Sequence, residues 1–145
     1  HRKRRMTISD FIKGPGKTAL GDDELLTKIV VPIDDFDRTF YRKVGTRKAM
    51  ALSKVSIAAA AKLSDDRISD IRVAFGAVAP TVVRSRRVEQ IAIGKSPHDI
   101  GELFDQMEAE YSKLIQPIDD QRSTADYRRR TSLNLLKYFL SEILR

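Results

Sequence analysis

The sequence predicts an α+β fold, in which a small antiparallel sheet of about three to four strands carries helices packed on one face, in two layers. Strand patterns fill the first half of the chain, including two apolar runs on either side of the polar turn "SDDR". Helical stripes with spacings of three and four residues occupy the second half. Strands first and helices grouped later are typical of a two-layer α+β domain.

The first 22 residues are basic and then rich in turns, with "GPGK" at 14–17 and "GDD" at 21–23. The run "ELLTKIVVP" follows, and its three β-branched residues before Pro32 predict a strand at about 26–31. "RTFYRKV" predicts a second strand at 38–44, which Gly45 ends. "GTRKAMA" then predicts a loop or a single helical turn.

The run "SKVSIAAAAKL" supports two interpretations. Alanine is the best helix former, so propensity favours a helix over 47–63. The next segment alternates, however, with Ile71, Val73, Phe75 and Ala77 on one face. We therefore expect an antiparallel hairpin of residues 54–63 and 69–79, with the helix as the alternative. The small alanines would then lie where another element packs closely on the sheet.

Three helices are predicted after the hairpin. The first covers "TVVRSRRVEQIAIG" and ends at Gly94. The second has Ser96 as its N-cap, Pro97 in its first position and Pro117 at its end. Its apolar stripe consists of Ile100, Leu103, Phe104, Met107, Tyr111 and Leu114. The third begins at a Ser/Thr cap with Asp126 in its first turn and becomes densely apolar toward its end.

Composition limits the function classes. The net charge of +7 favours anionic partners, but aromatic residues make up only 7%, which is few for a single-strand nucleic-acid platform. The chain has no cysteine and two distant histidines, so neither disulfides nor a metal site are expected. No apolar run approaches the length of about 20 residues that spans a bilayer. We expect a cytoplasmic protein with no membrane and no nucleic-acid partner.

Most charged motifs are interpreted as structural. "GPGK" lacks the spacing of a phosphate loop and predicts a turn. The acid pairs at 22–23, 34–35, 65–66 and 119–120 adjoin turns and are expected to be solvated, so no catalytic residue is assigned. "RSRR" and "YRRR" lie in predicted first helical turns and are interpreted as solvated helix faces, with an anionic ligand or a partner interface as the alternatives. Cations there oppose the helix dipole. Arg128–Arg130 are therefore expected to have a nearby acidic partner.

"YRKVGTRK" is the most informative stretch. If 38–44 is a strand, Arg42 and Lys43 point to opposite faces. Gly45 allows a bend, and Thr46–Lys48 form a cationic loop beside the sheet. A lysine in this position suits an electron-rich ligand, but from the residues alone an ordinary edge lysine that prevents aggregation is the favoured interpretation.

The ordered segments "LGDDELLTKIVVP", "FYRKVGTRKAMALSKVSIAAAA", "IRVAFGAVAPTVVRSRRVEQIAIG" and "STADYRRRTSLNLLKYFL" together resemble the C-terminal part of the FAD-binding subunit of molybdenum hydroxylases. This family includes xanthine dehydrogenases, carbon monoxide dehydrogenase and aldehyde oxidoreductases. The resemblance covers nearly the whole chain and agrees with the hairpin interpretation. It implies that residues 1–36 are the tail of a preceding FAD-binding domain and that residues 37–145 form the C-terminal α+β domain.

The resemblance also implies a role in an oxidoreductase, as a fragment that is not catalytic alone. Electrons would pass from a molybdopterin centre on one partner subunit, through 2Fe-2S clusters on an iron–sulfur subunit, to FAD and then to an acceptor. By position, Leu26 matches an apolar residue near the flavin ring and Lys43 a basic residue that points at it. Arg47 matches a recurrent arginine in the loop Val44–Lys54, which would border the flavin.

One segment departs from the family pattern. NAD-dependent eukaryotic members carry acidic residues after these arginines, whereas this chain has Ala49-Met50-Ala51, which weighs against NAD as the acceptor. The family's pyrophosphate-binding glycine loops are missing, so this chain alone is not expected to retain FAD. A docking module without cofactor contact is the main alternative, and a basic nucleic-acid-binding domain is a weaker one. The substrate belongs to the molybdenum subunit and is not encoded here.

Overall fold

The computed structural model describes residues 3–47 and 50–144 and divides into two units, His1–Asp34 and Asp35–Arg145. In the first unit, the helical turn α1 (Ile8–Phe11) leads into β1 (Ile12–Gly14), which pairs antiparallel with β2 (Lys17–Thr18). Thr7 caps α1 by accepting a hydrogen bond from the Asp10 N–H. "GPGK" forms the turn between β1 and β2, as predicted, and Gly16 adopts a φ of 66° there.

The predicted strand at 26–31 is wrong. Residues 25–37 contain no helix or strand, and large apolar side chains between Leu25 and Ile33 are exposed. β-Branched residues favour extended backbone, but a strand forms only where its N–H and C=O groups pair. Within the described part of the first unit, only β1 and β2 pair with each other, so this run has the pattern of a strand without a partner.

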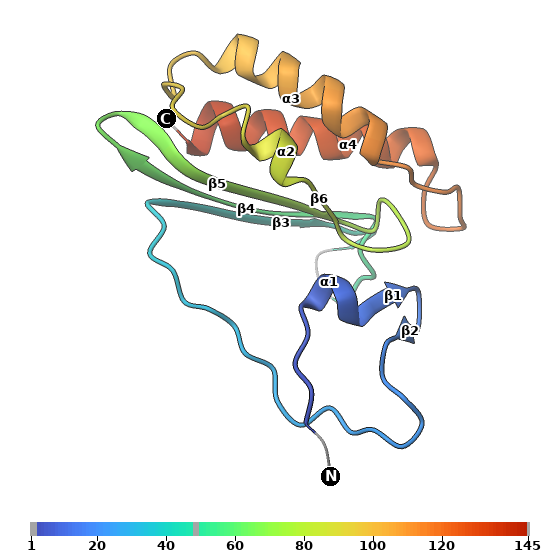
Figure 1. The fold of residues 1–145 in the computed structure, drawn as a ribbon. Coiled ribbons are helices and arrows are strands. Elements are labelled where there is room, and N and C mark those ends of the chain that lie inside the picture. Colours follow the sequence, from blue (N-terminus) through green and yellow to red (C-terminus); the bar gives the residue numbers. More distant parts are fainter. Residues whose placement is uncertain (1–2, 48–49, 145) are drawn as a thin grey trace. The chain divides into compact units, whose positions relative to one another are not determined.

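The second unit has the predicted α+β architecture. Its antiparallel sheet has the order β3 (Arg38–Val44), β4 (Val55–Ser64), β5 (Arg67–Gly76) and β6 (Val83–Arg84). The helices α2 (Arg86–Glu89), α3 (Ile100–Leu114) and α4 (Ala125–Tyr138) lie over one face of this sheet (Figure 1). A π-helical turn, η1 (Phe139–Ile143), continues α4.

The alanine run is a strand and not a helix. β4 pairs with β3 on one side and β5 on the other, and its residues alternate between buried and more exposed. Pairing on both sides satisfies the backbone and overrides alanine's helical propensity. Ala59 and Ala61 are buried beneath the helices, and their small size permits the expected close packing.

A tight turn joins β4 to β5. Asp65 and Asp66 both have positive φ, 50° and 56°, which is the geometry of the two-residue turns that match the twist of a hairpin. Just beyond the turn, Lys62 pairs with Asp70 but Leu63 pairs with Ile68, so Ser69 is an extra, bulged residue. Because of this bulge, both Ile68 and Ile71 face the core.

The predicted helix over 81–94 is mostly wrong. Val83 lies in β6 and pairs with Phe75 of β5. Only the single helical turn α2 follows, and Ser85 caps it. Further on, the Gly94 N–H donates to Ile68 O and the Ile68 N–H donates to Lys95 O, which ties this segment to the sheet. Backbone pairing with the sheet thus prevents a continuous helix. β5 also begins two residues before the predicted strand 69–79 and ends three residues before its predicted end, at Gly76.

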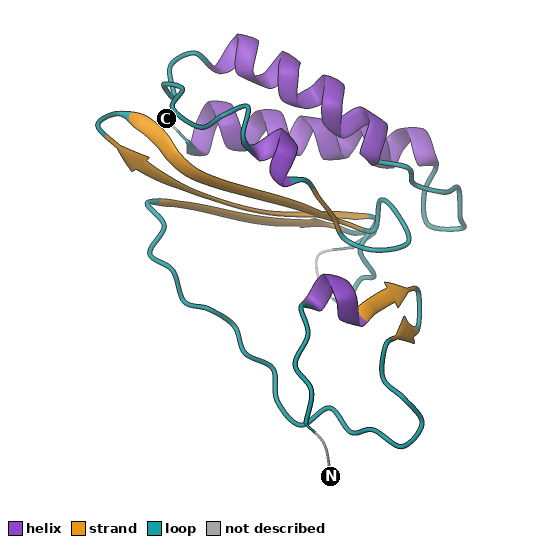
Figure 2. Cartoon of the chain, in the orientation of Figure 1, coloured by secondary structure: helices purple, strands orange, loops and turns teal. Residues whose placement is uncertain are grey.

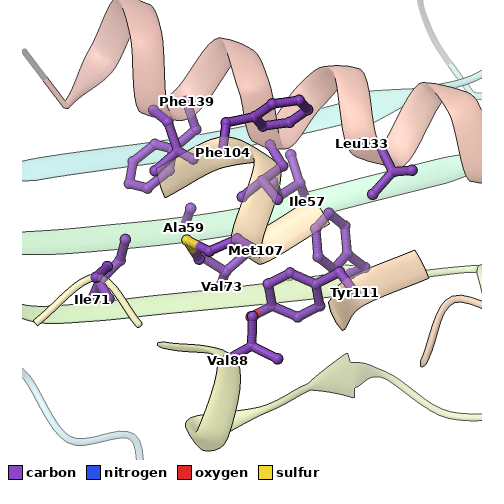
Figure 3. Packing of buried hydrophobic residues seen from close by; sticks show 14 of the residues in the cluster. Ile57, Ala59, Ile71, Val73, Val88, Phe104, Met107, Tyr111, Leu133 and Phe139 are labelled. Atoms are coloured by element: carbon purple, nitrogen blue, oxygen red, sulfur yellow. The ribbon is translucent and has the colours of Figure 1, made fainter. Parts of the chain in front are cut away.

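The last two helices are largely as predicted. α3 begins at Ile100 after Asp99, later than the Ser96–Pro97 start, because Ser96 accepts a bond from the His98 N–H in a turn instead. α4 begins after its cap Thr124. Figure 3 shows Met107 and Tyr111 of α3 and Phe139 beside Ile57, Ala59 and Val73 of the sheet. Leu114 remains partly exposed, and Ile115 is buried instead; the Ile100 side chain lies outside the described residues.

The secondary structure also shows where the loops gather (Figure 2). The β3–β4 connection and the β5–β6 connection both leave the sheet at the end where α4 begins. The Arg128 side chain of α4 bonds to the backbone of both connections there. Of the predicted functional residues of this unit, Lys43 lies near the end of β3 and Arg47 lies in the β3–β4 connection. Among the described residues, no helix combines the length and hydropathy needed to cross a bilayer.

Candidate functional site

The basic loop, Val44–Lys54, connects β3 to β4. The Lys54 N–H donates to Val44 O at 2.8 Å, which closes the loop at its base. Gly45 lies where the chain folds back, and a Cβ there would be 2.8 Å from the Ala51 Cβ. The position therefore requires glycine for close packing of the two arms of the loop. Lys48 and Ala49, which belong to the predicted loop, lie outside the described residues.

Lys43 and Arg47 both bind the far arm of the basic loop. The Lys43 Nζ donates to Ala51 O at 3.1 Å. Arg47 donates from Nε and Nη2 to Met50 O, at 3.3 and 2.8 Å. Met50 has a φ of 48°, a left-handed conformation that is uncommon outside glycine. The two cations thus hold a strained turn whose carbonyl groups point toward them.

The basic loop lies within a segment that has no carboxylates. Residues 38–64 contain seven lysines and arginines and no aspartate or glutamate. The partners of Lys43 and Arg47 in the structure are neutral carbonyl groups, so their positive charge is not compensated locally. Such a segment creates a positive potential that attracts anions. The Lys54 Nζ lies 5.4 Å from the centre of the Tyr127 ring and forms a cation–π contact with it.

The loop also offers apolar groups to a ligand. Met50 is 92% exposed and Leu52 is largely exposed, although both are apolar. The Ser53 hydroxyl is buried and has no hydrogen-bond partner among the described residues. Cations without carboxylate partners and exposed apolar side chains suit a ligand that is anionic in one part and apolar in another, as FAD is. Among the described residues, no cluster of carboxylates and histidines could hold a metal ion.

Arg128 fixes the base of the loop, a role that sequence reasoning missed. It is 4% exposed and donates from Nη1 to Lys54 O at 2.8 Å and to Ala77 O at 3.2 Å. Its Nη2 donates to the Asp120 carboxylate at 2.6 Å. The expected acidic partner is therefore present. The only sequence signal was the unfavourable position of an arginine in a first helical turn.

The neighbouring basic clusters are paired with acids as well. Arg130 donates to Asp126 at 2.6 Å, and Arg87 bonds to Glu110. Arg84 forms two bonds to the buried Glu89, whose carboxylate also accepts from the Val73 N–H at 2.9 Å. These contacts stabilise helix positions and the end of the sheet. "RSRR" and "YRRR" are therefore structural in large part.

The expectation that all the acid pairs are merely solvated is wrong for Asp120. Its carboxylate accepts bonds from the Arg122 and Ser123 N–H groups as well as from Arg128. Above all the Arg122 hydrogen bond, and then the Arg128 contact, lower the pKa of Asp120 below its usual value. The pair at Asp65–Asp66 is exposed in the hairpin turn, as expected.

Leu26 belongs to the first unit, and Lys43 and Arg47 belong to the second. The structure brings the two cations together on the far arm of the basic loop, where Lys43 donates to Ala51 O and Arg47 donates to Met50 O. Leu26 is 49% exposed, within the apolar run Leu25–Ile33 that has no secondary structure. Each unit is described by itself, so a role for Leu26 beside the basic loop stays a prediction.

Known proteins match this chain in sequence. Residues 40–143 match the family model of the CO dehydrogenase flavoprotein C-terminal domain. The glyceraldehyde dehydrogenase medium chain of Sulfolobus acidocaldarius is 37% identical over 126 residues, which are 87% of this chain and 44% of that one. The xanthine dehydrogenase FAD-binding subunit of Escherichia coli O157:H7 is 35% identical over 91 residues, 61% of this chain and 31% of that one.

Solved structures of carbon monoxide dehydrogenases are also similar to this chain. Carbon monoxide dehydrogenase from Hydrogenophaga pseudoflava superposes with a TM-score of 0.77 at 25% identity, covering 89% of this chain and 44% of that one. Reconstituted CO dehydrogenase from Oligotropha carboxidovorans has a TM-score of 0.78 at 22% identity, covering 88% and 44%, which shows the shared fold. The chain thus spans less than half the length of the curated relatives described above.

Proposed function

Because the chain belongs to the family of CO dehydrogenase flavoprotein C-terminal domains, we propose that it is the C-terminal domain of the FAD-binding subunit of a molybdenum hydroxylase. In this role it borders the flavin and docks partner subunits, and it has no complete catalytic site of its own. The observation that carries the proposal is the basic loop, where Lys43 and Arg47 bind only neutral carbonyl groups within a segment free of carboxylates.

The residues of the loop suit a flavin cofactor. Lys43 and Arg47 would supply positive charge to an electron-rich or reduced, anionic ring, while Met50 and Leu52 would cover apolar surface. Bound FAD would supply the redox chemistry, namely acceptance of electrons and their delivery to an acceptor. The chain's own contribution is to orient this group and stabilise its charge.

The first unit supports the proposed domain arrangement. Large apolar residues in the run Leu25–Ile33 are exposed, including Ile33 at 95%, and the run is too apolar for an ordinary surface segment. We propose that residues 1–36 complete a preceding FAD-binding domain, which covers this run. Leu26 would then be the apolar residue that packs near the flavin ring.

The partners and the electron route belong to the same proposal. Electrons would enter from a molybdopterin subunit through the 2Fe-2S clusters of an iron–sulfur subunit and leave to an acceptor. Met50 and Ala51 stand where NAD-dependent members carry acids, so an acceptor other than NAD is favoured. A cytoplasmic location is also part of the proposal and is tested by fractionation of the source cells.

FAD affinity provides the decisive test. The complete subunit, with its preceding flavin domain, is purified unchanged and as Lys43→Ala, Arg47→Ala and the control Lys95→Ala, which removes an exposed lysine from a distant turn. We expect Lys43→Ala and Arg47→Ala to weaken FAD retention about tenfold, measured by flavin fluorescence, and Lys95→Ala to leave it unchanged. Equal FAD affinity in all four proteins would instead support a docking module that does not touch the cofactor.

A further inference from the structure

β3 is an edge strand. It pairs with β4 on one side, and within the described part of the second unit no strand pairs with its other side. The alternate backbone groups of Arg38–Val44 that do not bond to β4 can therefore accept another strand. Edge strands of this kind bind extended peptides by adding them to the sheet.

A groove runs beside this edge. It has a volume of about 290 Å³ and lies between β3 and α4, lined by Phe40, Arg42, Thr131, Asn134, Leu135 and Tyr138. The Phe40 ring forms its apolar wall, with its centre 5.6 Å from that of Tyr138, which is itself 44% exposed. The groove can thus hold an apolar side chain next to the open edge.

The charges of β3 determine what can bind there. Strand alternation places Arg38, Phe40 and Arg42 on the same face, toward the helices. Arg42 forms no hydrogen bond or ion pair with the described residues, and Arg38 bonds only to the carbonyl oxygen of Asp37. An incoming strand therefore meets a cation, an apolar ring and a second cation at every other position.

We propose that β3 and this groove receive an extended segment of another polypeptide chain, which pairs with β3 as a fifth strand. On its groove face this segment carries a carboxylate, an apolar side chain and a second carboxylate at alternate positions. Directly opposed side chains lie close enough for ion pairs, so the carboxylates meet Arg38 and Arg42 and the apolar group covers Phe40. The pattern is symmetric and permits either strand direction.

A second copy of this chain is the less favourable occupant. If two β3 strands paired antiparallel around Phe40, Arg38 of one would face Arg42 of the other. Like charges on an edge strand oppose such self-association. The same cations that protect the edge from its own copies thus select an acidic partner. This inference rests on the second unit alone and is independent of flavin binding.

A peptide-binding measurement tests the proposal. The 145-residue chain is titrated with a labelled seven-residue peptide that has glutamate at its second and sixth positions, phenylalanine at its fourth and threonine elsewhere. A control peptide of the same composition has its two glutamates adjacent, which breaks the alternation. We expect fluorescence anisotropy to show about tenfold tighter binding of the alternating peptide, with new amide protection confined in β3 to the groups that do not bond to β4.

Two charge reversals complete the test. Arg42→Glu is expected to weaken binding of the alternating peptide about tenfold. Arg86→Glu is an equal change on α2, which follows β6 at the other edge of the sheet, and should change binding less than about twofold. Folding of both variants is checked by circular dichroism. Equal binding of the two peptides, an equal effect of the two substitutions, or no binding at millimolar peptide would overturn the proposal.

Discussion

At the scale of single residues, Arg128 connects the first turn of α4 to the base of the basic loop. Its guanidinium contacts Lys54 O, Ala77 O and the Asp120 carboxylate while almost completely buried. Arg128→Ala removes the bond to the partly exposed Asp120 carboxylate, which keeps its two backbone donors, and takes this buried donor from the carbonyl groups of Lys54 and Ala77. We expect the free energy of unfolding to fall by about 3 kcal/mol in urea denaturation.

Arg130→Ala provides the matched control for this change. Arg130 lies two residues further along the same helix and pairs with Asp126 at the surface. Exposed ion pairs contribute little, so this substitution should cost less than about 0.5 kcal/mol. If the two arginine substitutions cost the same, Arg128 does not hold the loop as described.

A second prediction at this scale concerns the substitution of Gly45. A methyl group there would approach the Ala51 Cβ to 2.8 Å, so Gly45→Ala must push the arms of the basic loop apart. We expect a loss of about 1–3 kcal/mol in unfolding free energy and faster amide exchange at Ala51 and Leu52. Gly101→Ala, in open space on α3, should instead stabilise the chain by up to about 1 kcal/mol. An unchanged loop in Gly45→Ala would contradict the close packing.

The sequence predicts some of these residue contacts and not others. The cations of the loop follow directly from "YRKVGTRK". That Lys43 and Arg47 bind the carbonyl groups of Ala51 and Met50 depends on the positive φ of Met50, which no residue-type rule indicates for methionine. The assignment of Leu26, Lys43 and Arg47 to a cofactor stays a prediction.

At the scale of elements, the hairpin was predictable because alternation is a strong signal where one face is buried. The segments at 26–31 and 81–94 were not, because their structure depends on what they pair with. The first has the β-branched residues that favour a strand, but no strand in the described part of its unit pairs with it. The second has helical spacing, but its backbone is held by the sheet edge at Phe75 and Ile68. Periodicity describes burial and does not describe backbone pairing.

The β4–β5 turn allows a stabilising substitution. Asp66 has a φ of 56°, which glycine adopts without steric cost. Asp66→Gly should therefore raise the unfolding free energy by about 0.5–1 kcal/mol, measured by thermal unfolding. Lys62→Gly, four residues earlier in extended backbone, should lower it because glycine weakens a strand. A loss of stability in Asp66→Gly would show that the aspartate side chain itself supports the turn.

At the scale of the whole molecule, acid should destabilise the second unit through Asp120. Its pKa in the folded state lies below the ordinary value of 3.8, chiefly because of the Arg122 N–H bond. The folded state therefore binds fewer protons than the unfolded state near this pH. The stability from Asp120 is complete above about pH 4 and is lost as the pH falls through the lowered pKa.

Asp120→Asn tests this pH dependence. The variant should be less stable than the unchanged chain at neutral pH, because the carboxylate that faces Arg128 is gone. Its unfolding free energy should also fall less steeply below about pH 4, measured by urea denaturation at a series of pH values. Parallel profiles for the two proteins would show that Asp120 does not contribute to acid sensitivity.

The bulge at Ser69 sets the phase of the hairpin. On either side of this residue the strand has the usual two-residue repeat, but in the sequence the two halves are out of step by one position. The bulge, in which two residues take the place of one, lets both halves face the same core. Deletion of Ser69 would remove the extra residue and leave Ile68 and Ile71 two residues apart, so both would still face the core in a regular strand. A single insertion or loss elsewhere in β5 would instead turn the apolar side chains of one half to the opposite face.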